Sequence, residues 1–66
     1  MTFAEKVKYV RGKLYLTQKQ LAEQLGVSFA TVNRWESQGI EPKFLVKRKF
    51  DDFCKENNIV FAGDES

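Results

Sequence analysis

Residues 17–39 read TQKQLAEQLGVSFATVNRWESQG, the pattern of two short helices joined by a tight turn. Thr17 and Gln20 have the spacing of a capping box, in which the hydroxyl accepts from one amide of the new helix and Gln20 accepts from the amide of Thr17. The first helix is therefore predicted over residues 18–25. Gly26 follows it and tolerates the positive φ that commonly ends a helix.

The second helix is predicted over residues 29–38, with Ser28 as its N-cap. Val32 and Trp35 are three residues apart, so they lie on one face and point back toward the first helix. The rest of the surface is formed by other side chains, namely Phe29, Ala30, Thr31, Asn33, Arg34 and Ser37. An outer face with Asn and Arg is suited to the edges of DNA bases.

Two further helices flank this pair. Residues 3–14 start with a second capping box and carry apolar residues at a 4-3-4 spacing, namely Phe3, Val7, Val10 and Leu14. Gly12 costs this helix about 1 kcal/mol relative to Ala, so we expect fraying from there to Tyr15. The last helix is predicted over residues 43–57, with Pro42 near its first turn. Its apolar stripe is Val46, Phe50, Phe53 and Cys54.

We assign residues 1–58 to one helical domain and residues 59–66 to a short apolar segment and a polar tail. Ile59, Val60 and Phe61 are too few for a sheet of their own. They could fold back on the core, add to a partner, or mark where a longer protein was cut. The tail from Gly63 is expected to be disordered. The fold class is thus all-α with four helices, and a short fifth element stays open.

Charge is distributed unevenly along the 66 residues. Residues 1–50 hold ten Lys and Arg against four acids, whereas residues 51–66 hold one Lys against five acids. The basic part is the expected nucleic-acid end. A lone Cys54, with no signal peptide or long apolar run, predicts a reduced, cytoplasmic protein outside the membrane.

The two central helices and the residues around them resemble the phage repressor and Cro-type helix-turn-helix domains, which are lambda-repressor-like domains of bacteria and phages. The resemblance spans about residues 7–53. It rests on an ordered set of residues, namely Leu16-Thr17-Gln18, Leu21-Ala22, Leu25-Gly26-Val27-Ser28, Thr31-Val32 and Arg34-Trp35-Glu36, followed by Pro42. It implies a DNA-binding transcriptional regulator, often a repressor and often a homodimer on a partly palindromic operator. Residues 59–61 are our candidate for the dimer surface.

The expected DNA contacts fall into two groups. Arg34 can donate to guanine N7 and O6, Asn33 can meet adenine, and other side chains of the second helix can touch thymine methyl groups, namely Phe29, Ala30 and Thr31. The expected backbone contacts are Arg11, Thr17, Gln18, Ser28, Ser37 and Lys43. For Gln18, the resemblance implies phosphate binding at a helix start. It also implies that Arg11 pairs with Glu36.

The loop after Glu36 departs from the family, whose members commonly carry a glycine followed by basic residues there. This chain reads Ser37-Gln38-Gly39-Ile40-Glu41, and Glu41 repels phosphate. Backbone affinity is therefore lower than usual or is carried by Lys43 and the last helix. The run Lys47-Arg48-Lys49 is either a solvated face or a phosphate contact.

An enzyme and a protein-interaction module are the two alternative classes of function. An enzyme is not expected, because the chain has no His, no metal-ligand cluster and no Gly-rich phosphate loop. No metal, cofactor or small-molecule substrate is expected either. The serious alternative is a helical protein-interaction module, or an antitoxin-like component that needs a partner. The basic first fifty residues and the outward Asn33 and Arg34 favour duplex DNA as the partner.

Overall fold

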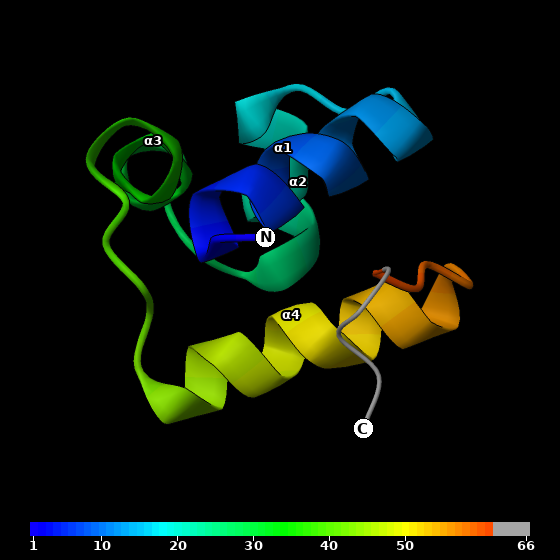
Figure 1. Cartoon of the computed structure of the whole chain (residues 1–66). Coiled ribbons are helices and arrows are strands. Elements are labelled where there is room, and N and C mark those ends of the chain that lie inside the picture. The colour runs from blue at the N-terminus through cyan, green and yellow to red at the C-terminus, as the bar shows by residue number, and fades with distance from the viewer. Residues whose placement is uncertain (62–66) are drawn as a thin grey trace.

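The computed structural model describes residues 1–61 and shows four helices and no strand over that range (Figure 1). The helices are α1 (Phe3–Leu14), α2 (Gln18–Leu25), α3 (Phe29–Gln38) and α4 (Phe44–Glu56). The predicted all-α fold class is confirmed, and within residues 1–61 there is no fifth helix. The expected disordered tail, from Gly63 onward, lies outside the described residues.

Side chains cap the first three helices as their sequences predict. At α1, the Glu5 amide donates to the Thr2 hydroxyl at 3.2 Å, and Glu5 Oε1 accepts from the Thr2 amide at 2.9 Å. At α2, Thr17 and Gln20 make the same two bonds at 3.0 and 2.9 Å. Ser28 accepts from the third amide of α3 at 3.1 Å. Each helix start is thus fixed locally, because these bonds satisfy amides that have no acceptor inside the helix.

Left-handed residues end the same three helices. Gly26 and Gly39 have φ of 71° and 68°, which glycine adopts without strain. Helix α1 extends through Gly12 to Leu14, the predicted end. Tyr15 ends it in the left-handed region at φ 57°, and its amide donates to the carbonyl of Arg11. A tyrosine therefore holds a conformation that favours glycine.

The last helix, α4, is one residue shorter at each end than the predicted range of about 43–57. Lys43 is the N-cap, with extended backbone and no capping bond from its side chain. Its carbonyl accepts from the amide of Lys47 at 2.9 Å, so the first helical residue is Phe44 and Pro42 lies before the helix. Asn57 leaves helical geometry, with φ −102° and ψ 13°.

The core gathers one face of every helix. Phe3 of α1 links α3 to α4, because its ring lies edge-on to Trp35 at 5.3 Å and to Phe50 at 5.1 Å between centroids. Helix α4 runs along one side of the other three helices in Figure 1. The buried residues are Phe3, Val7, Val10, Leu21, Ala22, Leu25, Val32, Trp35, Phe50, Cys54 and Ile59. Trp35 and Cys54 are therefore core residues, as expected from their spacing.

The segment after α4 folds back on this core, which was one of the three alternatives left open. Ile59 is 6 % exposed, and the Phe61 ring lies 5.7 Å from that of Tyr9 and beneath the Lys6 ammonium. Only Val60 is largely exposed among these three residues. The segment is thus mostly used inside its own chain, and little of it is left for a dimer surface.

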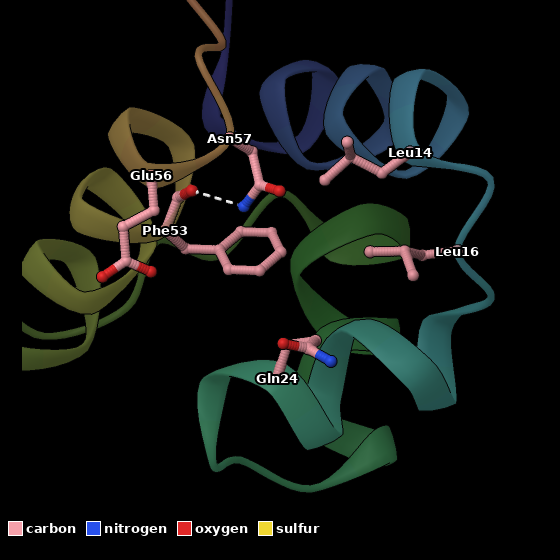
Figure 2. A pocket seen from close by; sticks show the side chains of 6 residues that line it. All are labelled: Leu14, Leu16, Gln24, Phe53, Glu56 and Asn57. Atoms are coloured by element: carbon pink, nitrogen blue, oxygen red, sulfur yellow. Dashed lines mark hydrogen bonds between the residues drawn. The ribbon is translucent and has the colours of Figure 1, made fainter.

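A shallow groove separates the end of α4 from α2 and the end of α1 (Figure 2). It has a volume of about 450 Å³ and is lined by Leu14, Leu16, Gln24, Phe53, Glu56 and Asn57. Asn57 turns back along α4, and its Nδ2 donates to the carbonyl of Phe53 at 2.8 Å (Figure 2). The groove is apolar where Leu14, Leu16 and Phe53 face it, and polar at its rim.

Candidate nucleic-acid interface

Helix α3 presents a polar stripe to solvent because its apolar residues are taken up by the core. Val32 and Trp35 are buried, at 0 % and 3 % exposure. The opposite side carries exposed residues at helical spacing, namely Ala30, Asn33, Arg34 and Ser37. Phe29, at the start of the helix, is 53 % exposed, and Thr31 is half-buried. All five predicted base-contact residues are therefore on one short helix, and four of them are exposed.

A bidentate ion pair joins α1 to the end of α3. Arg11 Nε donates to Glu36 Oε2 at 2.6 Å, and Arg11 Nη2 donates to Glu36 Oε1 at 2.8 Å. Arg11 Nη1 also donates to the carbonyl of Leu16 at 3.2 Å. The Glu36 side chain is only 6 % exposed. The pair that the resemblance implies is thus present, and it ties α3 to α1 and to the α1–α2 loop.

Both members of this pair are held in their charged forms. The hydrogen bond to Glu36 raises the pKa of Arg11 above its ordinary value, more than burial lowers it. Burial alone would raise the pKa of Glu36, but hydrogen bonds from Arg11 and Gln18, with the charges of Arg11 and Lys8, lower it overall. Glu36 is therefore a stable anchor at neutral pH.

Gln18 extends this contact from the first turn of α2 to the outward side of α3. Its Nε2 donates to Glu36 Oε1 at 3.0 Å, and its Oε1 accepts from Asn33 Nδ2 at 3.1 Å. A continuous polar chain thus runs from Arg11 through Glu36 and Gln18 to Asn33, and we call it the polar clamp. Because it spans three helices, it fixes the angle and register of α3 on the domain.

The sequence alone did not reveal the bonds of Gln18 to Asn33 and to Glu36. These residues are 15 and 18 positions away from Gln18, and no local spacing brings them together. The angle at which α2 crosses α3 brings Gln18 close to both residues. Lys8 also lies near enough to Glu36 for its charge to lower the pKa of that carboxyl.

The other predicted backbone contacts are distributed around α2 and α3. The hydroxyls of Thr17 and Ser28 accept from helix amides, and the Ser37 hydroxyl donates to the carbonyl of Asn33 at 2.8 Å. Lys43 is exposed at the start of α4 and takes no part in the polar clamp. The structure therefore links Arg11 and Gln18 through Glu36 and leaves Lys43 apart.

Two amides at the start of α2 are available to an outside acceptor. The capping box satisfies the amide of Gln20, and the amide of Leu21 donates to the carbonyl of Thr17. Those of Gln18 and Lys19 have no acceptor among residues 1–61. Free amides and the positive end of the helix dipole favour an anion at this position.

The loop between α3 and α4 carries an ion pair that reduces its net charge. Lys47 Nζ donates to Glu41 Oε1 at 2.9 Å, with both side chains about half exposed. Lys47 therefore offsets the carboxylate that was expected to repel phosphate. The three consecutive cations Lys47, Arg48 and Lys49 are all exposed.

Among residues 1–61, no group of three or more His, Cys, Asp or Glu is arranged to hold a metal ion. None of the four helices combines the length and the apolar character that crossing a bilayer requires.

Comparison with known protein families agrees with this geometry. A helix-turn-helix family model matches residues 7–46, more than half of the chain and all of α2 and α3. The chain belongs to the helix-turn-helix family of the lambda repressor and Cro type. Its domain is accordingly a DNA-binding regulator of transcription. Searches of curated proteins and of solved structures gave no match.

Proposed function

We propose that this protein binds duplex DNA sequence-specifically, with α3 in the major groove. We further propose that it acts in the cytoplasm as a repressor and binds as a homodimer to a partly palindromic site. By the geometry of this motif, the two half-sites would then be about 34 Å apart. One observation carries the proposal: α3 exposes an unpaired Arg34 beside Asn33 while the polar clamp holds the same helix rigidly to α1 and α2.

Arg34 is the main determinant of base specificity in this proposal. Its side chain is exposed and makes no hydrogen bond or ion pair with any residue in the range 1–61. A free guanidinium can donate to N7 and O6 of one guanine, the commonest specific contact in the major groove. No internal contact has to be broken before Arg34 binds a base.

Asn33 is a second base contact whose orientation is already restricted. One hydrogen of its Nδ2 is used by Gln18, which leaves the other hydrogen and Oδ1 for an adenine edge. Apolar contact with thymine methyl groups is assigned to Phe29, Ala30 and Thr31, at the amino-terminal end of α3. These contacts add preference at neighbouring base pairs.

Phosphates fix the position of the domain on the duplex. We assign one phosphate to the free amides at the start of α2, next to the side chain of Gln18. Arg11 has five donors, three of which are used inside the protein, so two remain for a phosphate. The other proposed backbone contacts are Thr17, Ser28, Ser37 and Lys43.

Selection from a random duplex library by the purified protein, at about 0.15 M salt, tests the proposal, because weak backbone attraction is already partly screened there. We expect enrichment of a two-fold symmetric site that contains a guanine in each half. Enrichment of a single asymmetric half-site would contradict the homodimer. No enrichment would contradict specific binding and would favour a protein-interaction module.

The division of roles is tested with alanine variants on the selected site. R34A should lose about 1 to 3 kcal/mol and relax the preference at one base pair, because it removes a base contact. Q18A should weaken binding to selected and unrelated duplexes through the lost backbone contact. It should leave the preference at the base pair read by Arg34 unchanged and reduce only the preference at the base pair read by Asn33, which Gln18 orients. K13A is a control for R34A, since it removes a positive charge from an exposed position of α1 that is assigned no DNA contact. Equal losses on every sequence for R34A and Q18A would refute the division.

A further inference from the structure

The outward side of α4 carries four exposed side chains in a line, namely Phe44, Arg48, Asp51 and Lys55. Their spacing of 4, 3 and 4 keeps them within about 60° of one another around an α-helix. They face away from Phe50 and Cys54, which α4 buries in the core. We call this line the α4 seam.

The seam is not satisfied within the described chain. Phe44 is 75 % exposed, and the side chains of Arg48, Asp51 and Lys55 make no hydrogen bond or ion pair with residues 1–61. A hollow of about 470 Å³ lies along the seam, lined by Phe44, Lys47, Arg48 and Asp51. The seam therefore combines an exposed aromatic ring, a hollow and unpaired charges of both signs.

The charges of α4 are arranged so that the helix is complementary to itself when reversed. About the midpoint between residues 49 and 50, Arg48 mirrors Asp51 and Phe44 mirrors Lys55. When a two-fold axis passes through this midpoint, mirrored positions of two antiparallel helices come into contact. Each mirrored pair then forms twice, once from each copy to the other.

We propose that two copies of this chain associate through the α4 seam, with the two helices antiparallel. Arg48 of each copy pairs with Asp51 of the other, and the Phe44 ring covers the stem and ammonium of Lys55. This inference rests on the homodimer of the proposed function and supplies its interface. No seam residue belongs to α2 or α3, the two helices that the proposed function assigns to DNA.

The seam is small, and this sets the expected strength of association. Helix α4 has 13 residues and is therefore about 20 Å long. One helix pair of this length covers less than the roughly 800 Å² per partner that is typical of stable complexes. The free protein should therefore dimerise weakly. Two adjacent half-sites would raise the effective concentration of the copies and hold the pair together.

Charge reversal at the seam tests the pairing through sedimentation equilibrium of the purified protein without DNA. R48D places two carboxylates opposite each other twice per dimer, and D51R does the same with two guanidinium groups. Each variant alone should dimerise at least about tenfold more weakly than the parent chain, since like charges face each other. An equimolar mixture of the two variants should recover dimers, because every facing pair is then complementary.

Two controls make this test specific to the seam. K49D and E56R change the same kinds of charge at exposed positions of α4 that lie off the seam, and they should leave the dimerisation constant within about twofold. Circular dichroism and thermal unfolding verify that all four variants are folded. A monomeric parent chain at millimolar concentration would overturn the proposal. Equal dimerisation of the parent and single variants, or a mixture that stays monomeric, would do so as well.

Failure of this inference can be told apart from failure of the proposed function. Binding of the R48D variant to a duplex with one half-site requires α2 and α3 but not the seam. If R48D binds that duplex like the parent chain while the seam test fails, only the interface is wrong. If the seam test succeeds and no duplex is bound specifically, the DNA-reading proposal is wrong.

Discussion

Arg11 and Glu36, twenty-five residues apart, are joined by two hydrogen bonds of 2.6 and 2.8 Å that connect the last turn of α1 to α3. The carboxylate is nearly buried, whereas the guanidinium is 26 % exposed. The same carboxylate receives a third bond from Gln18. Glu36 is therefore the centre of the polar clamp, and its charge holds α1, α2 and α3 in one arrangement.

The first prediction concerns acid stability. The pKa of Glu36 is lowered in the folded protein, so its contribution to stability is complete above its ordinary pKa of 4.5 and is lost as pH falls below that value. At pH 7, E36Q should lose about 1 to 2 kcal/mol of unfolding free energy, a discounted value because Arg11 is partly exposed. Urea unfolding from pH 7 to pH 3 measures the difference. It should shrink as the pH falls; a constant difference would contradict the assignment.

The second prediction concerns the glycine inside α1. Gly12 is exposed, lies in regular helix, and a Cβ added there would meet no atom within 4 Å. G12A should therefore raise the unfolding free energy by about 0.5 to 1 kcal/mol, through lower entropy of the unfolded chain and better helix propensity. Thermal unfolding measures the gain, and K13A on the same helix is a control for a general surface effect. A fall in stability would show that the position is constrained.

The third prediction concerns the end of the same helix. The Tyr15 side chain contributes little packing, because the residue is 91 % exposed. Its backbone is strained, because φ lies in the left-handed region. Y15G should raise the unfolding free energy by about 1 kcal/mol, because glycine removes that strain. The flexibility of glycine in the unfolded chain offsets part of this gain. Y15A removes the ring but keeps the strain and should have almost no effect. Equal effects of Y15G and Y15A would contradict this explanation.

The fourth prediction concerns the lone cysteine. Burial, together with the charge of Asp51, raises the pKa of Cys54 to about 11 from 9.0. The shift corresponds to about a hundredfold smaller thiolate fraction at pH 8, and burial restricts access further. Iodoacetamide should therefore modify the folded protein at least about a hundredfold more slowly than the urea-unfolded protein, as followed by mass spectrometry. Similar rates in both states would mean that Cys54 is accessible.

Local features of the fold could be predicted from the sequence, because they are set within four residues. The capping boxes of Thr2 and Thr17, the cap at Ser28 and the glycine at Gly26 each act on their own helix end, and all four have the predicted conformation. The start of the last helix was harder to predict, since Lys43 has no capping side chain to mark it.

Long-range features of the site depended on the angles between helices. The Arg11 to Glu36 pair was expected only because the chain resembles a known family. The bonds of Gln18 to Glu36 and Asn33 arise from the crossing of α2 and α3, which no spacing in the sequence encodes. Likewise, the sequence left three roles open for residues 59–61, and the burial of Ile59 depends on space left by the other helices.

The most direct measurement of the proposed reading of DNA is a double-mutant cycle between Arg34 and single guanines of the selected site. Each guanine is replaced in turn by 7-deazaguanine, which lacks the N7 acceptor in the major groove. For one guanine per half-site, the replacement should cost the parent protein about 1 to 3 kcal/mol and cost R34A almost nothing, because the contact is already gone. If every replacement weakens the parent protein and R34A equally, Arg34 does not read guanine from the major groove.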